Sequence, residues 1–478
     1  MCGVALFYGP MAQQHMLVAL DKLVHRGPDD THSYESGKLA LGFVRLAIND
    51  ISTAGRQPYH FKKMVGAFNG EIYNAKSLSK QYTLSLNSQC DTHVILPLFD
   101  ALGEKVLTEL DGFYSGIIYQ HDTSKVYLLR DHMGKKPLFY GESDGCVFVI
   151  SELKALSKVD RFEQVPLGLS CLDLLTGKLE HLASHRLPIN TSNNLAMALE
   201  QAVVKRLPTQ AFGIFLSGGL DSSIISAIAH RHRQDITYFV LGNPDNADVT
   251  MANQLIQHLG LKKIRYIPLP DQQELSELIK EVVRTTESYN PSIISNGLAT
   301  YLLARAAHHE GIKVVLTGEG ADELFSGYHQ YLSEPQWQTT RQALIGDMCF
   351  TELRRLDKAC MAHSIEARCP FLDRHVKSIA DSLKHEDFYS SEHNKAILRH
   401  TYVDLLPFEV LQRKKTSCDV GSGIRKQVVE LLTRHGDSEQ KVLQSIWQRL
   451  FHSHKEHSYF FSYPVFDEVI AKRGIAHR

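Results

Sequence analysis

The sequence predicts an α/β protein of two domains, because the two halves of the chain carry different patterns. At 478 residues the chain is too long for a single hydrophobic core. In the first half, short apolar runs broken by turn residues indicate mostly strands. In the second half, strand-like and helix-like segments alternate, which is typical of a parallel sheet covered on both faces. A polar stretch at 186–194 is the expected linker between domains at 1–185 and 195–478.

The individual elements follow from these patterns. The strands expected in the first half lie at 2–8, 39–48, 64–68, 116–119, 125–129, 138–140 and 147–151. The helices expected there lie at 11–23, 91–98 and 101–110. The second half is expected to run helix 195–206, strand 211–216, helix 222–232, strand 236–241, helix 249–259, strand 264–269, helix 299–310 and strand 313–317. Ligands of such a parallel sheet bind at the carboxyl ends of its strands.

Composition excludes several classes of function. A hydrophobic content of 43% and a charged content of 22% are ordinary for a globular protein. Lys+Arg 52 against Asp+Glu 53 gives a net charge of −1, so no nucleic-acid or membrane partner is expected. No apolar run approaches the ~20 residues that cross a bilayer. The eight cysteines contain no C-x-x-C pair, which indicates neither a zinc site nor a disulfide framework and fits a reducing cytoplasm best.

Cys2 is the first candidate for chemistry. Removal of the initiator methionine would leave its thiol beside its own α-amino group. Nucleophile and general base would then stand on one residue, the arrangement of an N-terminal nucleophile. The alternative is a small buried hydrophobic residue at the start of an edge strand.

The run Ser-Gly-Gly-Leu-Asp-Ser-Ser at 217–223 has the features of a phosphate-binding loop. It follows an expected strand and opens an expected helix, and its glycines let successive N–H groups face an anion. It lacks the Gly-Lys-Ser/Thr ending of a P-loop. Because Asp221 is an acid beside phosphates, we expect Mg²⁺ between them. The alternative is a glycine turn with an Asp/Ser cap at an ordinary helix start. A second glycine-rich loop, 317–323, follows another expected strand.

Further motifs are spread along the whole chain in a fixed order. They are Cys2-Gly3, His25-Arg26-Gly27-Pro28-Asp29, Leu41-Gly42 with Arg45-Leu46, Asn69-Gly70-Glu71-Ile72-Tyr73-Asn74, Cys90-Asp91-Thr92, Arg130-Asp131, Ser151-Glu152-Leu153-Lys154, the 217–223 loop, Gly318-Glu319-Gly320-Ala321-Asp322-Glu323, Glu366-Ala367-Arg368, Pro370-Phe371-Leu372-Asp373 and Lys415. With this series the chain resembles the glutamine-dependent asparagine synthetases, which are class II amidotransferases. The 217–223 loop resembles the pyrophosphate loop of the ATP pyrophosphatases.

The resemblance implies a fold and an activity. The fold is an αββα sandwich of the N-terminal-nucleophile (Ntn) hydrolase type, followed by a doubly wound parallel-sheet ATP-pyrophosphatase domain of the adenine nucleotide alpha hydrolase-like kind. The activity is adenylation of the aspartate side chain with ATP and Mg²⁺, then attack by ammonia released from glutamine. The products are asparagine, glutamate, AMP and pyrophosphate. The segment 436–478 is rich in His and aromatic residues, and either helical packing or a contact in a homodimer would explain it.

The resemblance also assigns roles in the glutaminase half. Cys2 is the nucleophile, and Asn69 with the Gly70 N–H forms the oxyanion hole. Glutamine is held by Arg45, Ile48, Glu71 and Asp91. Judged from the residues alone, Arg45 reads equally as a surface charge, Asp91 as a helix N-cap, and Asn69-Gly70 as a hairpin turn.

In the synthetase half the resemblance assigns a nucleotide site. ATP and pyrophosphate contact Leu216, Ser217, Gly218, Gly219, Asp221, Ser222, Leu241, Thr317 and Gly318. Asp221 and Asp322 hold the metal. Glu319 and Lys415 are catalytic, and Lys415 stabilises the pentavalent phosphorus. From local sequence alone, Lys415 also reads as a solvated lysine in a basic run. Glu366 and Arg368 are expected to form a partly buried ion pair that organises the site.

One segment departs from the family pattern. Members that use aspartate typically carry Asp where this chain has Asn290, and Thr-Thr-x-Arg where it has Ser292-Ile293-Ile294-Ser295. An arginine suits an acidic substrate, and Ser295 cannot replace it. Either another basic residue supplies the charge, or the acceptor is a different carboxylic acid. A non-catalytic protein that binds glutamine or nucleotide is the third alternative.

Overall fold

The computed structural model describes residues 2–121, 123–187, 194–328, 337–455 and 457–461. Contacts divide the chain into two compact units, named here unit 1 (residues 1–187 and 451–456) and unit 2 (residues 188–450 and 457–478). Of the predicted linker 186–194, residues 188–193 lie outside the described residues, as do residues 462–478 of the His- and aromatic-rich segment.

Unit 1 contains two six-stranded antiparallel sheets. The first has the order β10-β8-β9-β1-β3-β2, with β1 Cys2–Tyr8, β2 Asp30–Ser36, β3 Leu39–Arg45, β8 Phe139–Ser143, β9 Cys146–Ile150 and β10 Arg161–Gln164. The second has the order β12-β11-β7-β6-β5-β4, with β4 Tyr59–Phe61, β5 Met64–Ile72, β6 Gly112–Gln120, β7 Lys125–Arg130, β11 Gly168–Asp173 and β12 Leu179–Ala183.

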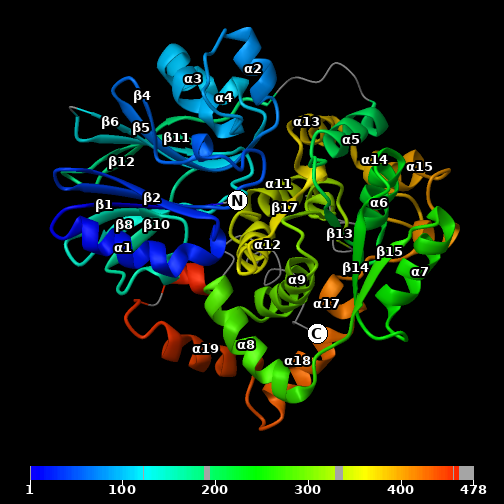
Figure 1. The fold of residues 1–478 in the computed structure, drawn as a ribbon. Helices are drawn as coiled ribbons and strands as arrows, with labels where there is room; N and C mark the ends of the chain where they lie inside the picture. Colours follow the sequence, from blue (N-terminus) through cyan, green and yellow to red (C-terminus); the bar gives the residue numbers. More distant parts are fainter. Residues whose placement is uncertain (1, 122, 188–193, 329–336, 456, 462–478) are drawn as a thin grey trace. The chain divides into compact units, whose positions relative to one another are not determined.

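The strand alternation builds four layers in unit 1. On β5, Val65 and Ala67 point into a core shared by both sheets, while Phe68 belongs to a second core on the outer face. The helices of that outer face are α2 Ala75–Gln81, α3 Ile95–Leu102 and α4 Val106–Glu109. Helix α1, Ala12–Leu23, packs on β1 and β3 of the other sheet. The layers therefore form the predicted αββα sandwich (Figure 1).

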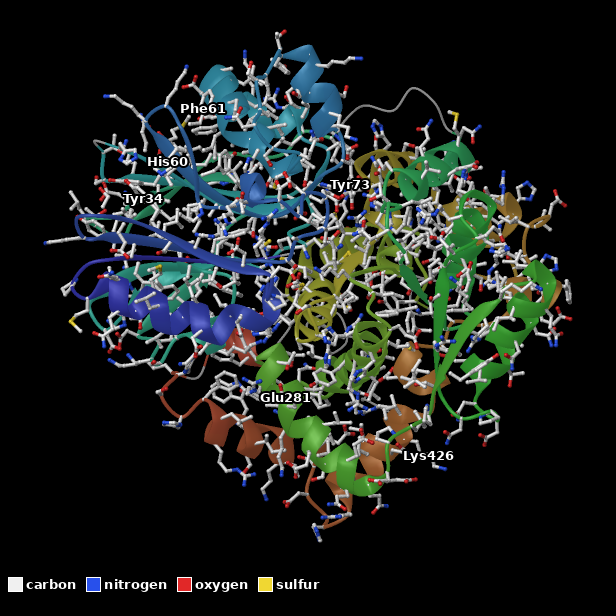
Figure 2. The ribbon with its side chains drawn as sticks, in the orientation of Figure 1. Tyr34, His60, Phe61, Tyr73, Glu281 and Lys426 are labelled. Atoms are coloured by element: carbon white, nitrogen blue, oxygen red, sulfur yellow. The ribbon has the colours of Figure 1, made fainter. Side chains whose placement is uncertain are left out.

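The end strands of the two sheets meet through aromatic side chains. Tyr34 of β2 and His60 of β4 have ring centroids 5.2 Å apart in an edge-to-face arrangement, and they lie next to each other in Figure 2. His121, just beyond β6, packs edge-to-face on the same tyrosine ring at 5.6 Å. This contact closes one side of the sandwich.

Unit 2 is built on a parallel sheet of order β15-β14-β13-β16-β17. Its strands are β13 Gly213–Phe215, β14 Thr237–Leu241, β15 Lys263–Ile267, β16 Val314–Leu316 and β17 Glu366–Arg368. The helices are α5 Leu195–Val204, α6 Leu220–His232, α7 Ala247–Leu259, α8 Gln272–Thr286, α9 Pro291–His309, α10 Ala321–Leu324, α11 Trp337–Asp347, α12 Glu352–Met361, α13 Arg374–Ser382, α14 His385–Phe388, α15 Ala396–Thr401, α16 Phe408–Gln412, α17 Cys418–Gly421, α18 Ile424–Thr433 and α19 Glu439–Leu450. The predicted two-domain α/β class is confirmed.

The strand order defines a switch point in unit 2. From β13 the chain first adds β14 and β15 on one side, and later places β16 and β17 on the other (Figure 1). The loops that leave β13 and β16 consequently diverge from adjacent strand ends, where doubly wound sheets bind ligands. The two predicted glycine-rich loops are these two loops.

Membrane-spanning helices are absent from the described ranges, where every helix is too short or too polar to cross a bilayer.

His93 makes the stability of unit 1 sensitive to acid. Its ring stacks on Tyr59 with centroids 4.1 Å apart, and burial lowers the pKa of His93 to about 4. The unfolded chain, with a histidine pKa near 6.5, binds more protons between pH 4 and 6.5, so the stability contribution is present above pH 6.5 and is lost as pH falls. From pH 7 to pH 5 we expect a loss of about 2 kcal/mol from this residue.

Urea denaturation at the two pH values measures this loss. His93→Phe keeps the ring on Tyr59 and cannot titrate, so its free energy of unfolding should fall by about 2 kcal/mol less than that of the parent protein over the same interval. An equal fall in both proteins would contradict the assignment.

Candidate active sites

Cys2 lies at the start of β1, a strand held between β3 and β9 and not at a sheet edge as the alternative interpretation had it. The residue is buried and stands opposite Arg45 in the β1–β3 register. Its backbone N–H donates to Oδ1 of Asn69 at 2.9 Å, and its carbonyl accepts from Nε of Arg26 at 3.0 Å. The thiol-bearing residue is thus fixed at both backbone groups.

Asn69 is fully buried on β5. Its Oδ1 is occupied by Cys2, whereas its Nδ2 is buried with no hydrogen-bond partner among the described residues. An unpaired buried donor costs about 1–3 kcal/mol, so a ligand that accepts this hydrogen bond gains that amount. The residue that binds the Cys2 backbone therefore carries an unpaired donor, which is what an oxyanion hole requires.

Gly70 continues β5 and is not part of a hairpin turn, because Asn69 and Gly70 pair with Ser115 and Tyr114 of β6. The φ of Gly70 is +152°, and a Cβ there would lie 2.1 Å from the carbonyl oxygen of Phe113. Any other residue would separate the two strands.

The predicted glutamine-binding residues are held by a network of short contacts. Arg45 is buried, not on the surface, and donates to the backbone oxygens of Asp50 and, at 2.8 Å, of Ser52. Asp91 accepts from the Ile72 N–H at 2.6 Å. It begins the short 3₁₀ helix Asp91–Val94, but its carboxylate does not cap that helix.

Asn49, which the sequence analysis missed, joins two of these residues. Its Nδ2 lies 3.0 Å from Oδ1 of Asp91 and 3.3 Å from Oε1 of Glu71. It follows the predicted Ile48, which is half-buried. The only sequence signal for Asn49 is its position next to Ile48. Its contact with Asp91 joins residues 42 positions apart, which local sequence does not reveal.

A buried carboxylate with three basic partners is linked to Cys2 through Arg26. Glu152 accepts from Arg26 at 2.5 Å, from His25 at 3.0 Å and from Lys154 at 2.6 Å. Burial favours the neutral acid, but the charges of Lys154, His25 and Arg26 outweigh it and hold the pKa of Glu152 well below its usual range. The anion orients Arg26, which in turn holds the Cys2 carbonyl.

In unit 2 the 217–223 loop closes on itself through hydroxyl groups. The Ser217 N–H donates to Oγ of Ser222 at 3.3 Å, and that hydroxyl donates to the Gly219 carbonyl at 3.1 Å. Gly218 has a φ of +66°, and a Cβ there would lie 2.3 Å from the Ala252 nitrogen of α7. Gly219 is the N-cap of α6, so Asp221 is not the capping residue of the alternative interpretation.

Asp221 and Asp322 converge from the two glycine-rich loops. Both carboxylates contact Nζ of Lys395, at 2.7 Å and 2.6 Å. Lys415 contacts the other oxygen of Asp322 at 2.5 Å. Burial opposes ionisation of Asp322, but the ammonium groups of Lys395 and Lys415 hold its pKa well below the usual range. Burial of Lys415 lowers its pKa, but the charge of the Asp322 carboxylate outweighs this effect and the pKa of Lys415 is raised. Both partners are therefore charged.

Lys395 was missed by the sequence analysis. It is buried and adopts a left-handed backbone with φ 53° at the start of α15. Two carboxylates that approach one ammonium this closely offer the oxygen ligands that a hard divalent cation takes. The two carboxylates are therefore donors of the kind that a hard cation such as Mg²⁺ takes.

A cavity of about 1020 Å³ opens at this point in unit 2. Of the predicted nucleotide, metal and catalytic residues of unit 2, all but Gly218 line it, namely Leu216, Ser217, Gly219, Asp221, Ser222, Leu241, Thr317, Gly318, Glu319, Asp322 and Lys415. A cavity of this size lies at the upper end of the range found for small-molecule sites, about 300–1,000 Å³.

Two further basic residues of unit 2 form ion pairs, and of these Arg413 lines the cavity. Arg413 donates to the Ser217 carbonyl at 2.9 Å and pairs with Asp248 of α7, which ties the phosphate loop to its neighbours. Arg368 pairs with Glu366 at 2.6 Å. This last pair is fully buried on β17, and not partly buried as predicted.

The departing segment lies at the start of α9. Asn290 lines the cavity and is the N-cap, because its Oδ1 accepts from Ser292 N–H at 2.9 Å while its Nδ2 donates to the Phe461 carbonyl at 2.9 Å. Ser295 is completely buried and does not line the cavity.

Two family comparisons match the chain in succession. The family described as glutamine amidotransferase domain matches residues 1–175, and the family described as asparagine synthase matches residues 194–346 and 347–472. The fold and the two sites thus define an enzyme class in which an amidotransferase half is joined to an ATP-using synthetase half.

Curated relatives agree over most of the chain. A probable asparagine synthetase [glutamine-hydrolyzing] of Acanthamoeba polyphaga mimivirus is 33% identical over 465 residues, which cover 87% of this chain and 84% of the relative. Asparagine synthetase B [glutamine-hydrolyzing] of Escherichia coli (strain K12) is 32% identical over 435 residues, which cover 84% of this chain and 77% of the relative. The protein belongs to the asparagine synthase family.

Proposed function

We propose that the protein is a glutamine-hydrolysing asparagine synthetase, an ATP-dependent carbon–nitrogen ligase. The observation that carries the proposal is the convergence of Asp221, Asp322 and Lys415 in one cavity of unit 2, in a chain whose unit 1 holds Cys2 against a buried, unpaired Asn69 donor. The names of the relatives agree with it. The reducing cytoplasm and a homodimer remain predictions.

In unit 1, the thiol of Cys2 attacks the side-chain amide carbon of glutamine. The α-amino group of Cys2 takes the thiol proton and passes it to the departing ammonia, which leaves a thioester. This role requires Cys2 to be the first residue of the mature chain, which its intact mass tests. Nδ2 of Asn69 and the N–H of Gly70 donate to the tetrahedral oxyanion. Water then hydrolyses the thioester to glutamate.

Four residues are proposed to bind glutamine while this happens. Arg45 takes the α-carboxylate and Asp91 the α-ammonium, with Ile48 and Glu71 beside them. The Asp50–Ser52 turn supports Arg45, and Asn49 sets the separation of Asp91 from Glu71.

In unit 2, the side-chain carboxylate of aspartate attacks the α-phosphorus of ATP, and pyrophosphate departs. Ser217, Gly219 and Ser222 bind the phosphate oxygens, and Leu241 packs on the adenine. Mg²⁺, held by Asp221 and Asp322, would neutralise the charge of the pyrophosphate. Lys415 stabilises the charge that develops on phosphorus. Ammonia then attacks the acyl carbon, which gives asparagine and AMP.

The test is acid-dependent exchange of pyrophosphate into ATP with the purified protein. We expect exchange with aspartate, and asparagine when glutamine is added. Exchange with another carboxylic acid alone would assign the chain to a different amide ligase. No exchange with any acid would reject the synthetase function.

Asn69→Ala tests the oxyanion hole. It removes the only side-chain donor assigned to the oxyanion, so we expect kcat for glutamine hydrolysis to fall about 10²–10³-fold. Glutamate release measures it. Ammonia-dependent asparagine synthesis is the control and should stay within about threefold, because it does not use this site. A fall of less than about fivefold in glutamine hydrolysis would reject the role.

A further inference from the structure

Residues 457–461, called here the strap, pack against the turn between α8 and α9 in unit 2. The Phe460 carbonyl accepts from Oγ of Ser288 at 2.9 Å and from the Tyr289 N–H at 3.0 Å. The carbonyl that follows in the strap accepts from Nδ2 of Asn290 at 2.9 Å. Three consecutive residues of the turn therefore donate to two consecutive carbonyl groups of the strap.

Aromatic and cationic side chains also hold the strap. The Phe461 ring stacks on Tyr289 with centroids 5.1 Å apart. The Arg354 guanidinium lies 3.7 Å from the centre of the Tyr459 ring, and Lys358 donates to the hydroxyl of the same tyrosine at 3.2 Å. Because Arg354, Lys358 and Tyr459 are all buried, the strap is a packed part of unit 2.

The strap reaches the synthetase cavity at Phe461, which lines it together with Asn290. Oδ1 of Asn290 caps α9 by accepting from the Ser292 N–H, while Nδ2 holds the Phe461 carbonyl. An amide supplies this acceptor and this donor from one side chain. An aspartate at position 290 would keep the cap but would set a carboxylate oxygen against the Phe461 carbonyl oxygen.

The activated acid formed in this cavity must be kept from water until ammonia arrives. Water attack on its acyl carbon breaks the bond to AMP and returns the free acid. ATP is then converted to AMP and pyrophosphate, and no amide forms. An apolar wall limits this side reaction because it excludes water from the site. Phe461 contributes an apolar ring to the wall of this cavity.

We propose that Asn290 is a positioning residue that fixes the strap as a wall of the synthetase cavity, and that this wall protects the acyl-adenylate from water. The inference rests on the proposed function and adds to it a device that retains the intermediate. Asn290 acts through the Phe461 carbonyl and not through a contact with a substrate. The amide at position 290, where the family pattern has an acid, is then matched to the strap.

The test compares asparagine formed with pyrophosphate released by the full-length enzyme, with aspartate, ATP and ammonium chloride as substrates. Asn290→Asp should lower the ratio of asparagine to pyrophosphate at least about threefold, because a loosened strap admits water. Gln440→Glu is the matched control. It makes the same change of amide to acid at an exposed residue that lines the same cavity, and it should leave the ratio unchanged.

Variants of Phe461 test the wall itself. Phe461→Ala should lower the ratio at least about threefold, and Phe461→Leu, which keeps apolar volume, should recover about half of that loss. Asn290→Asp added to Phe461→Ala should lower the ratio by less than about 1.5-fold more, because both changes act through one wall. If Asn290→Asp does not fold, as its thermal midpoint will report, Asn290→Ser replaces it, since serine keeps a capping oxygen and does not reach the strap.

Equal falls in asparagine and pyrophosphate, with an unchanged ratio in either single variant, would overturn the proposal, since the strap would then only stabilise unit 2. Full and independent effects in the double variant would overturn the action of Asn290 through Phe461. Failure of the proposed function looks different, because the unaltered enzyme would then show no aspartate-dependent release of pyrophosphate at all.

Discussion

Replacing Cys2 by alanine is expected to reduce glutamine-dependent asparagine synthesis by at least about 10⁴-fold, because the covalent route through the thioester is lost. Ammonia-dependent synthesis should stay within about threefold of the unaltered enzyme, since adenylation needs only residues of unit 2. Parallel assays of asparagine with glutamine and with ammonium chloride measure both rates. The ratio between them isolates the glutaminase chemistry from any change in aspartate or ATP binding.

Cys90 offers a matched control for this variant. It is a second thiol of unit 1, and its Sγ lies 3.3 Å from Oγ1 of Thr92. Burial raises the pKa of the Cys90 thiol to about 12, so it is protonated at neutral pH and is a poor nucleophile. Cys90→Ala should therefore retain glutamine-dependent synthesis within about threefold. Equal losses in both variants would mean that packing, and not the Cys2 nucleophile, was disturbed.

The elements that the sequence predicted best are those whose pattern is local. The strand at Cys2–Tyr8 and the helix at Ala12–Leu23 follow from periodicity, and the structure places them within one residue of the predicted bounds. The strand predicted at 64–68 continues to Ile72, because Asn69-Gly70 reads as a turn until β6 is seen beside it. Pairing with β6 is a tertiary contact that no local propensity contains.

Long helices of unit 2 were harder to predict. Helix α9 was expected from 299 but begins at Pro291, where Asn290 supplies the cap and the proline takes the first position. Helix α8, Gln272–Thr286, was not predicted, although its buried residues recur at helical spacing. In both cases the sequence contains a capping residue at the start of the helix, Asp271 for α8 and Asn290 for α9. The prediction relied on the alternation of strands and helices and did not use these residues.

The site residues also fall into those that local sequence predicts and those that only the folded structure reveals. The glycine-rich loops were recognisable because their chemistry is carried by consecutive residues. Asn49 and Lys395 were not, because each acts on partners that only folding brings close. Lys395 meets Asp221 across 174 positions of sequence, and the isolated lysine carries no signature of that contact.

Replacing Lys415 by methionine is expected to lower both pyrophosphate exchange and asparagine synthesis by about 10³-fold with either nitrogen source. Methionine retains the length of the side chain and removes the charge that stabilises the phosphorus in transit. Glutamine hydrolysis should continue, because the Cys2 site does not use this lysine. Exchange of labelled pyrophosphate in the presence of aspartate measures the first step directly. Lys414→Met is the control, because Lys414 is exposed and lines the same cavity, and it should remain within about threefold.

The pH dependence separates a catalytic charge from a structural one. The Asp322 carboxylate, which accepts from Lys415 at 2.5 Å, raises the pKa of this lysine above its ordinary value. The ammonium is therefore charged throughout the working range, and the deficit of Lys415→Met should be the same at pH 7 and pH 9. Lys395 still neutralises Asp322 in the variant, so its thermal midpoint should change little. A large drop in that midpoint would show that Lys415 chiefly stabilises the structure around Asp322. A deficit that differs between pH 7 and pH 9 would contradict an ammonium that stays charged over this range.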